Sequence, residues 1–279
     1  MSRTSVIVLV VGGLIVAGTG RGVPAAMMAT AQGGPAGETD KAAVKQAAYD
    51  YAEGYYEGAV DRMARAVDPT LAKRGLLSRP GTGLFLSPMN AETLVEATRS
   101  GGGKATAADK RAIAFTLLDI RDNVASAKIF TATFNDYLHL VKRDDGWRLI
   151  NVLWQPPSPA GAANAEADKA AVAQVFTGYI EAVAAGDAPR VERALHPEAV
   201  LRAFGPTPAG RFFLREGNRE SIVEQVRVKA VPAPQAPAIT VLDVYDNIAS
   251  AMVTTPTGVS YWHLAKQNGQ WRLVNRLSR

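Results

Sequence analysis

Apolar residues recur with a helical period between residues 168 and 186. Val172, Phe176 and Tyr179 are spaced three or four positions apart, which places them on one face of a helix. Gly186 follows and suits the end of this helix, because glycine readily adopts the left-handed conformation found there. The pattern predicts an amphipathic helix in which Tyr179 lies on the buried face.

The same order of helices is expected in two parts of the chain. An aspartate, Asp40 or Asp168, stands where the first helix begins, and its carboxylate is expected to accept hydrogen bonds from the free amides of the first turn. Gly58 is expected to end the earlier helix. Two further helices follow in each part: residues 59–67 and 187–195, which stop before Pro69 and Pro197, and the amphipathic segments 90–99 and 218–227.

The later part of each region has the pattern of strands joined by tight turns. Residues 113–120 and 239–244 lead to Asp-Asn pairs at 122–123 and 246–247, and these residue types tolerate the left-handed conformation of a hairpin turn. Further strands flank the turns at 144–146 and 268–269. Helices followed by a meander of strands predict the α+β class, with helices covering one face of a curved antiparallel sheet.

The chain contains two copies of one sequence. Asp-Lys-Ala-Ala-Val at residues 40–44 returns at residues 168–172, and thirteen of the thirty positions from Asp40 to Pro69 are identical at this offset of 168 − 40 = 128. Two later motifs return at an offset of 261 − 137 = 124: Tyr-x-His-Leu-x-Lys from residues 137–142 and Trp-Arg-Leu-x-Asn from residues 147–151. A repeat of about 115 to 120 residues has the length of a domain and is too long for a solenoid unit.

Composition excludes several classes of function. The chain has no cysteine, and therefore no disulfide, thiolate nucleophile or cysteine-bound metal. With three histidines and no paired carboxylates at ligand spacing, we expect neither a metal nor another cofactor. The formal net charge of +5 becomes +3 without Arg3 and Arg21, and no basic cluster lies beside an aromatic run. We therefore expect no nucleic-acid partner.

The first residues have the pattern of an export signal. Arg3 precedes an uncharged run at residues 6–17, and Ala29-Thr30-Ala31 is a small-x-small sequence. We predict a signal peptide at residues 1–31, cleavage near Gln32, and a periplasmic or secreted protein without a membrane partner after cleavage. An uncleaved anchor is the alternative, although a membrane helix needs about 20 apolar residues.

Proline, glycine and small residues mark the expected domain boundaries. Residues 32–39 are predicted to be a disordered lead-in and residues 155–167 a linker. The predicted domains are residues 40–154 and 168–279.

Motifs of the first copy resemble one known family. An inward tyrosine on the first helix and a short helix ending at a proline are followed by Asp-Tyr-Leu-His-Leu at residues 136–140 and by the closing strand at residues 146–154. This pattern is similar to the putative lumazine-binding family of the nuclear transport factor 2-like (SnoaL-like) superfamily, over nearly all of residues 40–154. The second copy resembles a more diverged member, because Ser260 replaces Asp136.

The resemblance implies a cone-shaped domain whose helices and bent sheet enclose a pocket. Superfamily members serve as isomerases, dehydratases, cyclases or epoxide hydrolases, and others only bind ligands or dimerise, so the fold alone selects no function. Compared with the ketosteroid isomerase branch, Tyr51 and Tyr179 match its oxyanion tyrosine, while His139 and His263 match its protonated acid. Such a Tyr–His pair would polarise a carbonyl, but the base of that branch has no counterpart here, where Arg74 is among the nearest charged residues.

Ten residues are candidates for ligand contacts. Packing is the alternative role of the tryptophans, and hydrogen bonding within a semi-polar core is the alternative role of the Tyr–His pairs. The candidates are Tyr51, Tyr55, Arg74, His139, Trp147 and Asn151 in the first copy, and Tyr179, His263, Trp271 and Asn275 in the second.

Three hypotheses of function follow. The leading one is an exported tandem-domain protein that binds a small apolar or aromatic molecule without converting it. The second is an isomerase- or dehydratase-type enzyme that uses a Tyr–His pair, and the third is a structural dimerisation module, for which the core would be filled by side chains. Because Lys73 and Asp136 occur only in the first copy, binding is expected mainly in residues 40–154, with His139 more important for it than His263.

The two copies are also expected to meet. A linker of 13 residues spans up to about 40 Å at about 3.1 Å per residue. We predict an internal pseudo-dimer in which sheet packs on sheet.

Overall fold

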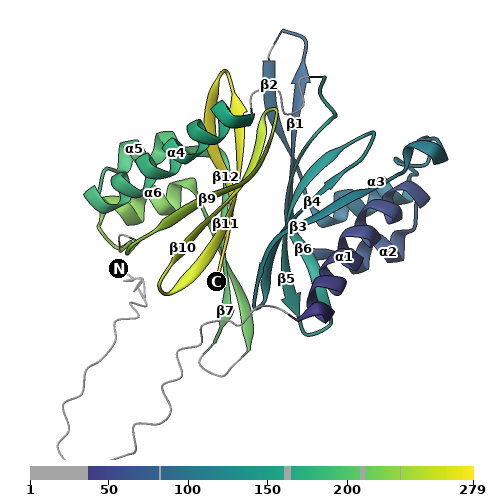
Figure 1. The fold of residues 1–279 in the computed structure, drawn as a ribbon, viewed down its shortest axis with the longest axis horizontal. Coiled ribbons are helices and arrows are strands. Elements are labelled where there is room, and N and C mark those ends of the chain that lie inside the picture. The colour runs from purple at the N-terminus through teal and green to yellow at the C-terminus, as the bar shows by residue number, and fades with distance from the viewer. Residues whose placement is uncertain (1–36, 82, 160–164, 208–210, 233) are drawn as a thin grey trace, which may run out of the picture. The chain divides into compact units, whose positions relative to one another are not determined.

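Two similar α+β halves make up the part of the chain that the computed structural model describes, which is residues 37–81, 83–159, 165–207, 211–232 and 234–279. Each half has a six-stranded sheet with three α-helices on one of its faces (Figure 1). The predicted fold class, two tandem domains with helices packed on a curved sheet, is confirmed. The predicted signal peptide lies outside the described residues.

The first half contains three α-helices, one short 3-10 helix and six strands. In chain order they are α1 (Glu38–Glu57), α2 (Val60–Ala66), β1 (Val67–Arg79), β2 (Gly83–Met89), α3 (Ala91–Arg99), η1 (Ala108–Lys110), β3 (Ala114–Arg121), β4 (Val124–Phe130), β5 (Asn135–Arg143) and β6 (Gly146–Gln155).

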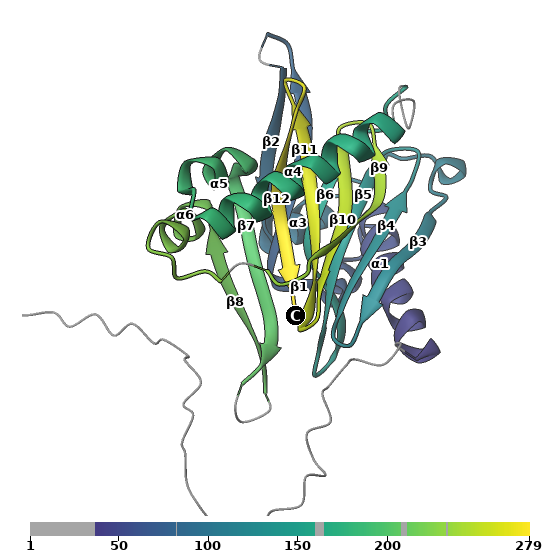
Figure 2. The same ribbon diagram turned by 60° about the vertical axis from the view of Figure 1, so that its left-hand side comes forward.

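The second half repeats this order of α-helices and strands, and in Figure 2 α4 runs across the strands of its sheet. Its elements are α4 (Ala165–Ala185), α5 (Ala188–Ala194), β7 (Leu195–Pro206), β8 (Phe212–Asn218), α6 (Arg219–Arg227), β9 (Ala238–Tyr245), β10 (Ile248–Thr255), β11 (Gly258–Gln267) and β12 (Gln270–Ser278).

Each sheet is mixed, whereas the sequence predicted a purely antiparallel one. The strand orders are β2-β1-β6-β5-β4-β3 and β8-β7-β12-β11-β10-β9. One pair in each sheet is parallel, β1 with β6 in the first and β7 with β12 in the second. The cause is the short helix α2, which returns the chain to the end of the sheet where β6 begins, so that Val67 pairs with Leu149 and both strands run the same way.

The strands β1, β2, β7 and β8 were not predicted from the sequence. The middle of β1, from Leu71 to Leu76, is buried on both faces, so the alternation of apolar and polar residues that identifies a half-exposed strand is absent. The short helix α2 ends at Ala66, and Pro69 lies near the start of β1 rather than directly after the helix.

Several predicted helix ends and turns are confirmed. Gly58 and Gly186 end α1 and α4 with φ of 67° and 71°, in the left-handed region. Asp122 and Asp246 occupy the hairpin turns with φ of 48° and 49°. The amphipathic segment that begins at residue 90 is α3, and the Asn90 side chain accepts a hydrogen bond from the backbone N–H of Thr93 at 2.8 Å.

The predicted capping role of Asp40 is wrong. Helix α1 begins at Glu38, so Asp40 lies inside its first turn. The carboxylate of Asp40 instead accepts hydrogen bonds from Trp147 Nε1 at 2.9 Å and from Lys142 Nζ at 2.7 Å. Both donors lower the pKa of this carboxyl, because they stabilise its charged form.

Asp168 makes the equivalent contacts with a lysine and a tryptophan in the second half. It accepts hydrogen bonds from Lys266 Nζ at 2.9 Å and from Trp271 Nε1 at 3.2 Å. These hydrogen bonds join the first helix of each half to its last hairpin. This structural role explains why the motifs around these residues occur in both copies.

Replacing Trp147 by Phe is expected to lower the free energy of unfolding by about 1 kcal/mol, the usual net value of one hydrogen bond. The substitution removes the N–H that Asp40 accepts and keeps an aromatic ring. Urea unfolding measures the change. Trp154→Phe is the matched control, because the Trp154 indole makes no hydrogen bond within the described residues. An equal loss of stability in both variants would contradict this role of Asp40.

The two sheets pack against each other through the faces that their helices leave free. Two apolar clusters contain residues of both halves. One includes Tyr137 and Leu153 with Ile248 and Val274, and the other includes Val141 and Ile150 with Phe204, Tyr261 and Leu277.

Equivalent residues make reciprocal contacts across this interface. Tyr137 donates to Asp243 Oδ2 at 2.7 Å, and Tyr261 donates to Asp119 Oδ2 at 2.6 Å. The two pairs are equivalent at the offset of 124. Tyr137 corresponds to Tyr261 (137 + 124 = 261), and Asp119 corresponds to Asp243 (119 + 124 = 243). Reciprocity of this kind characterises a two-fold interface between like subunits, as expected for an internal pseudo-dimer.

The segments next to the halves are shorter than predicted. Residues 32–36 of the expected lead-in and 160–164 of the expected linker lie outside the described residues. The ends of both segments belong to regular elements, since α1 begins at Glu38, β6 includes Gln155 and α4 begins at Ala165. No helix in the described part of the chain combines the length and the apolarity needed to cross a membrane.

Candidate functional site

A cavity of about 210 Å³ lies in the first half, between its helices and its sheet. Aromatic and apolar side chains form most of its wall, and Lys73 is the one charged residue in the described lining. The lining residues are Tyr51, Tyr55, Lys73, Met89, Leu94, Ala97, Gly102, Thr106, Thr133, Phe134 and Trp154.

Lys73 belongs to a buried polar cluster with Tyr51 and Asp136. Its Nζ donates to the Tyr51 hydroxyl at 2.5 Å and lies 3.4 Å from Asp136 Oδ2. The Tyr51 hydroxyl donates to the same carboxylate oxygen at 2.5 Å. The three side chains come from α1, β1 and β5, and the residues are 3%, 6% and 0% exposed for Tyr51, Lys73 and Asp136.

Burial dominates the electrostatics of the cluster. Loss of hydration lowers the pKa of Lys73, although Asp136 opposes this shift, and raises the pKa of Asp136, although Lys73 and Tyr51 oppose it. Burial and the nearby carboxylate raise the pKa of Tyr51 well above its usual value. The Lys73 ammonium also lies 4.9 Å from the ring centroid of Trp154, where the ring face favours a cation.

This arrangement leaves hydrogen-bonding capacity at the cavity. An ammonium group has three donors, and the described contacts of Lys73 use two of them. Asp136 Oδ1 has no hydrogen-bond partner within the described residues. A buried ion pair is expensive to maintain and seldom adds stability, so its place beside a cavity indicates a functional site.

The second half lacks the cluster. Leu201 and Ser260 stand where the first half has Lys73 and Asp136. Trp262 donates from Nε1 to Ser260 Oγ at 2.8 Å and packs edge-on against Tyr179, with ring centroids 5.6 Å apart. The large indole thus occupies the region in front of the buried tyrosine.

Tyr179 and Trp271, which were predicted to line a pocket, instead border a surface groove of about 390 Å³ between α4, α5 and β12. The Tyr179 residue itself is buried. The described lining of the groove contains no acid, and its charged residues are Arg190, Arg193 and Arg272.

The predicted pairing of His139 with Tyr51 is wrong. Successive residues of a strand point to opposite faces, so Asp136 points towards the helices whereas His139, three positions later, points towards the other half. The rings of His139 and His263 stack at a centroid distance of 3.6 Å, and both residues are fully buried. Neither histidine lies at the cavity of the first half, and His139→Ala is now expected to affect stability rather than ligand binding.

The two predicted asparagines hold this histidine stack. Asn151 Nδ2 lies 3.2 Å from His139 Nδ1, and Asn275 Nδ2 lies 3.2 Å from His263 Nδ1. An amide N–H donates, so each Nδ1 accepts and each Nε2 carries the proton of a neutral ring. Neither Nε2 has a partner in the described structure.

Burial keeps both imidazoles neutral. It lowers the pKa of His139 well below its usual value, with further contributions from His263 and Arg202. It lowers the pKa of His263 to about 3. The stack is thus part of the interface between the halves.

The ten predicted site residues are dispersed over several places. Tyr51 and Tyr55 line the cavity of the first half, Trp147 binds Asp40, and Arg74 lines a different cavity between the halves. The other six lie at the histidine stack or at the surface groove: His139, Asn151, His263 and Asn275 at the former, Tyr179 and Trp271 at the latter.

Lys73, Asp136 and Trp154 were not among the predicted contacts. Their signal in the sequence is a difference between the copies, since the second copy has Leu201, Ser260 and Ser278 at these positions. Within the described residues, no group of three or more histidine and acidic side chains is placed to hold a metal ion.

Helices covering one face of a bent six-stranded sheet, with a cavity between the layers, define a ligand-binding fold of the nuclear transport factor 2-like type. The family model described as "Putative lumazine-binding" matches residues 39–155 and again residues 167–278. The chain therefore belongs to this family, in two tandem copies. No curated protein matches the chain.

Several solved structures are similar to parts of the chain. A nuclear transport factor 2-like protein of unknown function from Silicibacter pomeroyi is 21% identical, covering 41% of this chain and 97% of its own, with a TM-score of 0.34. One from Shewanella baltica is 15% identical, with coverages of 41% and 94% and a TM-score of 0.33. A ketosteroid isomerase-like protein from Erwinia carotovora is 13% identical, with coverages of 44% and 100% and a TM-score of 0.32.

Proposed function

We propose that this protein is exported and binds one small aromatic molecule in the cavity of its first half, without converting it. The second half completes an internal pseudo-dimer. The observation that carries the proposal is the buried cluster of Lys73, Tyr51 and Asp136, which adjoins an aromatic cavity and is present in one copy of the repeat only.

Size and lining limit the class of ligand. A cavity of about 210 Å³ is smaller than the sites that hold drug-sized molecules, which measure about 300 to 1,000 Å³. It suits a ligand of one or two fused rings. Tyr55, Phe134 and Trp154 offer ring contacts, and the free donor of Lys73 suits a ring carbonyl or another acceptor. Lumazine, which the family description names, is a planar bicyclic compound with ring carbonyls.

Binding without conversion is supported by the contacts of the cluster. Lys73, Tyr51 and Asp136 are hydrogen-bonded to one another, and the high pKa of Tyr51 keeps its hydroxyl protonated. The Tyr–His mechanism has no support, because His139 and His263 lie at the interface. A ligand recovered with unchanged mass and an unchanged NMR spectrum after prolonged incubation would support this role, because an isomerised product would keep the mass but alter the spectrum.

Export is supported by the sequence of residues 1–31. The mature protein is expected to begin close to Gln32 and to be periplasmic or secreted. N-terminal sequencing of the protein from its own host is the direct test. A mature chain that begins at Ser2 in the cytoplasm would contradict export.

Lumazine added to the full chain is expected to bind with a stoichiometry of one, and Lys73→Gln is expected to weaken binding about 10- to 100-fold. A hydrogen bond from a charged group contributes about 1.5 to 3 kcal/mol, which corresponds to this range. Fluorescence titration measures both quantities. Lys45→Gln is the matched control, since it removes the same charge from an exposed position on α1.

Two outcomes would count against the proposed site. Equal affinity in Lys73→Gln and the wild type would show that the ligand does not use the cluster. A stoichiometry of two would show that the second half binds as well, although Trp262 fills the region before Tyr179.

A further inference from the structure

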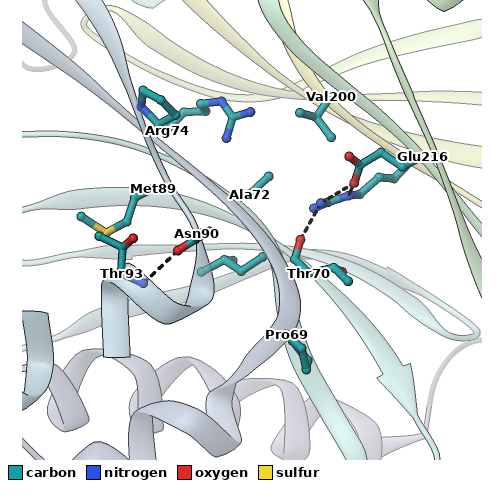
Figure 3. Close-up of a pocket in the computed structure, with 12 residues that line it drawn as sticks. Pro69, Thr70, Ala72, Arg74, Met89, Asn90, Thr93, Val200 and Glu216 are labelled. Atoms are coloured by element: carbon teal, nitrogen blue, oxygen red, sulfur yellow. Dashed lines mark hydrogen bonds and ion pairs between the residues drawn. The ribbon is translucent and has the colours of Figure 1, made fainter. Parts of the chain in front are cut away.

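A second, larger cavity of about 550 Å³, which is open to solvent along one side, lies between the halves. The first half contributes residues of β1, the end of β2 and the start of α3, and the second half contributes residues of β7 and β8. Figure 3 shows Arg74, Met89 and Asn90 on one side of this space and Val200 and Glu216 on the other. None of these residues belongs to the cluster around Asp136.

Arg74 is a buried cation without adequate partners at this cavity. The residue is 9% exposed, and its guanidinium extends from β1 towards Val200 (Figure 3). Within the described residues its Nε has no hydrogen-bond partner, and its one hydrogen bond is a long one of 3.3 Å from a terminal nitrogen to the backbone oxygen of Lys73. Burial lowers the pKa of Arg74, and an unpaired buried guanidinium is costly.

The equivalent arginine of the second half is fully bonded. Arg202 corresponds to Arg74 at the offset of 128, since 74 + 128 = 202. Its terminal nitrogens donate to Ile150 O at 2.6 Å, to Asn151 Oδ1 at 2.7 Å and to Thr70 O at 2.5 Å. Arg202 is therefore a structural link between the halves. Arg74 makes no such set of contacts with the residues that the structure describes, which points to a partner outside the chain.

The acids near Arg74 do not neutralise it. Glu216 is engaged by Arg202, with oxygen–nitrogen distances of 2.8 and 2.6 Å. Glu198 favours the charged form of Arg74 from a distance, but the described residues contain no ion pair between them. The charged lining residues are Arg74, Arg202 and Glu216, so the described lining carries one net positive charge.

The remaining lining suits the apolar part of a ligand. Leu71, Pro88, Met89 and Val200 supply apolar surface, and α3 begins at the cavity, so that the partial positive charge of its N-terminus adds to that of Arg74. One net positive charge with apolar walls matches a monoanion that has an apolar body better than it matches a phosphate.

We infer that the cavity between the halves is a second binding site, which takes a small organic carboxylate. The carboxylate pairs with the Arg74 guanidinium through two parallel hydrogen bonds, and the apolar body lies against Met89 and Val200. The charged groups of the two sites are separate, because Lys73 and Arg74 are neighbours on β1 and point to opposite faces, whereas Met89 lines both cavities.

Calorimetric titration of the full chain with octanoate tests this site. We expect saturable binding to the wild type, with octanol and inorganic phosphate each at least about tenfold weaker. Arg74→Gln is expected to weaken octanoate binding about tenfold or more, because a charge-assisted pair is lost. Thr93 is an exposed residue that lines the same cavity. Thr93→Trp should also block octanoate binding, because the indole would fill the space, while Arg74 is unchanged.

The outcomes separate this site from the proposed function. Lys73→Leu should leave octanoate binding unchanged, and Arg74→Gln should leave lumazine binding unchanged. Circular dichroism and thermal unfolding confirm that the variants fold. Octanoate binding that survives both Arg74→Gln and Thr93→Trp would overturn the inference, as would phosphate binding that equals octanoate binding.

Discussion

Acidification from about pH 7 to about pH 5 is expected to reduce the free energy of unfolding by about 2 kcal/mol for each stacked histidine. His139 and His263 are neutral and fully buried in the folded protein, whereas in the unfolded chain they take up protons with a pKa of about 6.5. The stabilisation from neutral rings is complete above that pKa. It is lost as the pH falls below it towards the folded pKa, which is about 3 for His263.

Urea unfolding over this pH range measures the loss. The double variant His139→Gln/His263→Gln retains amide hydrogen bonding but has no group that titrates at the stack, so its stability should depend less on pH than that of the wild type. His196→Gln is the control, because His196 is the remaining histidine and makes its hydrogen bonds to Gln267 and Glu198, away from the stack. The stability of this variant should retain most of the pH dependence of the wild type. An unchanged slope in the double variant would contradict the neutral stack.

Asp136→Ser is expected to lower the free energy of unfolding by about 3 to 5 kcal/mol, because it leaves the Lys73 ammonium buried without its carboxylate. The double variant Lys73→Leu/Asp136→Ser has the residues of the second copy at both positions. It should regain most of this stability, since replacing a buried ion pair by uncharged side chains is often neutral. Thermal and urea unfolding of the three proteins test this.

The contrast between stability and binding is the informative result. If the cluster serves a ligand, the double variant should be stable and unable to bind lumazine. A double variant as unstable as Asp136→Ser would instead show that the ion pair is a structural element of the first half.

The repeated sequence predicted the two domains and their class, and the structure explains which residues both copies kept. Asp40 with Trp147 and His139 with Asn151 recur because they fasten a helix to a hairpin and form the interface. Such residues were chosen as site candidates because they recur. The cluster at the cavity lies where the copies differ, as at Asp136 and Ser260.

It was harder to predict towards which face of the sheet each strand residue points. A shift of one position, or of any odd number, moves a side chain to the opposite face of a sheet. His139 and Asp136 are three positions apart on β5 and therefore point to opposite faces of the sheet. The prediction that His139 lines the pocket thus assigned the wrong face of β5 to the helices. Strand β1 gave no alternation at all, because Lys73 and Arg74 are both buried, one on each face.

Native mass spectrometry of the protein purified from its own host tests the proposed binding site most directly. The wild type is expected to retain one small aromatic molecule per chain, and the folded double variant Lys73→Leu/Asp136→Ser, expressed in the same host, is expected to retain none. Retention of the same molecule at the same occupancy by the double variant would contradict a site built on Lys73, Tyr51 and Asp136.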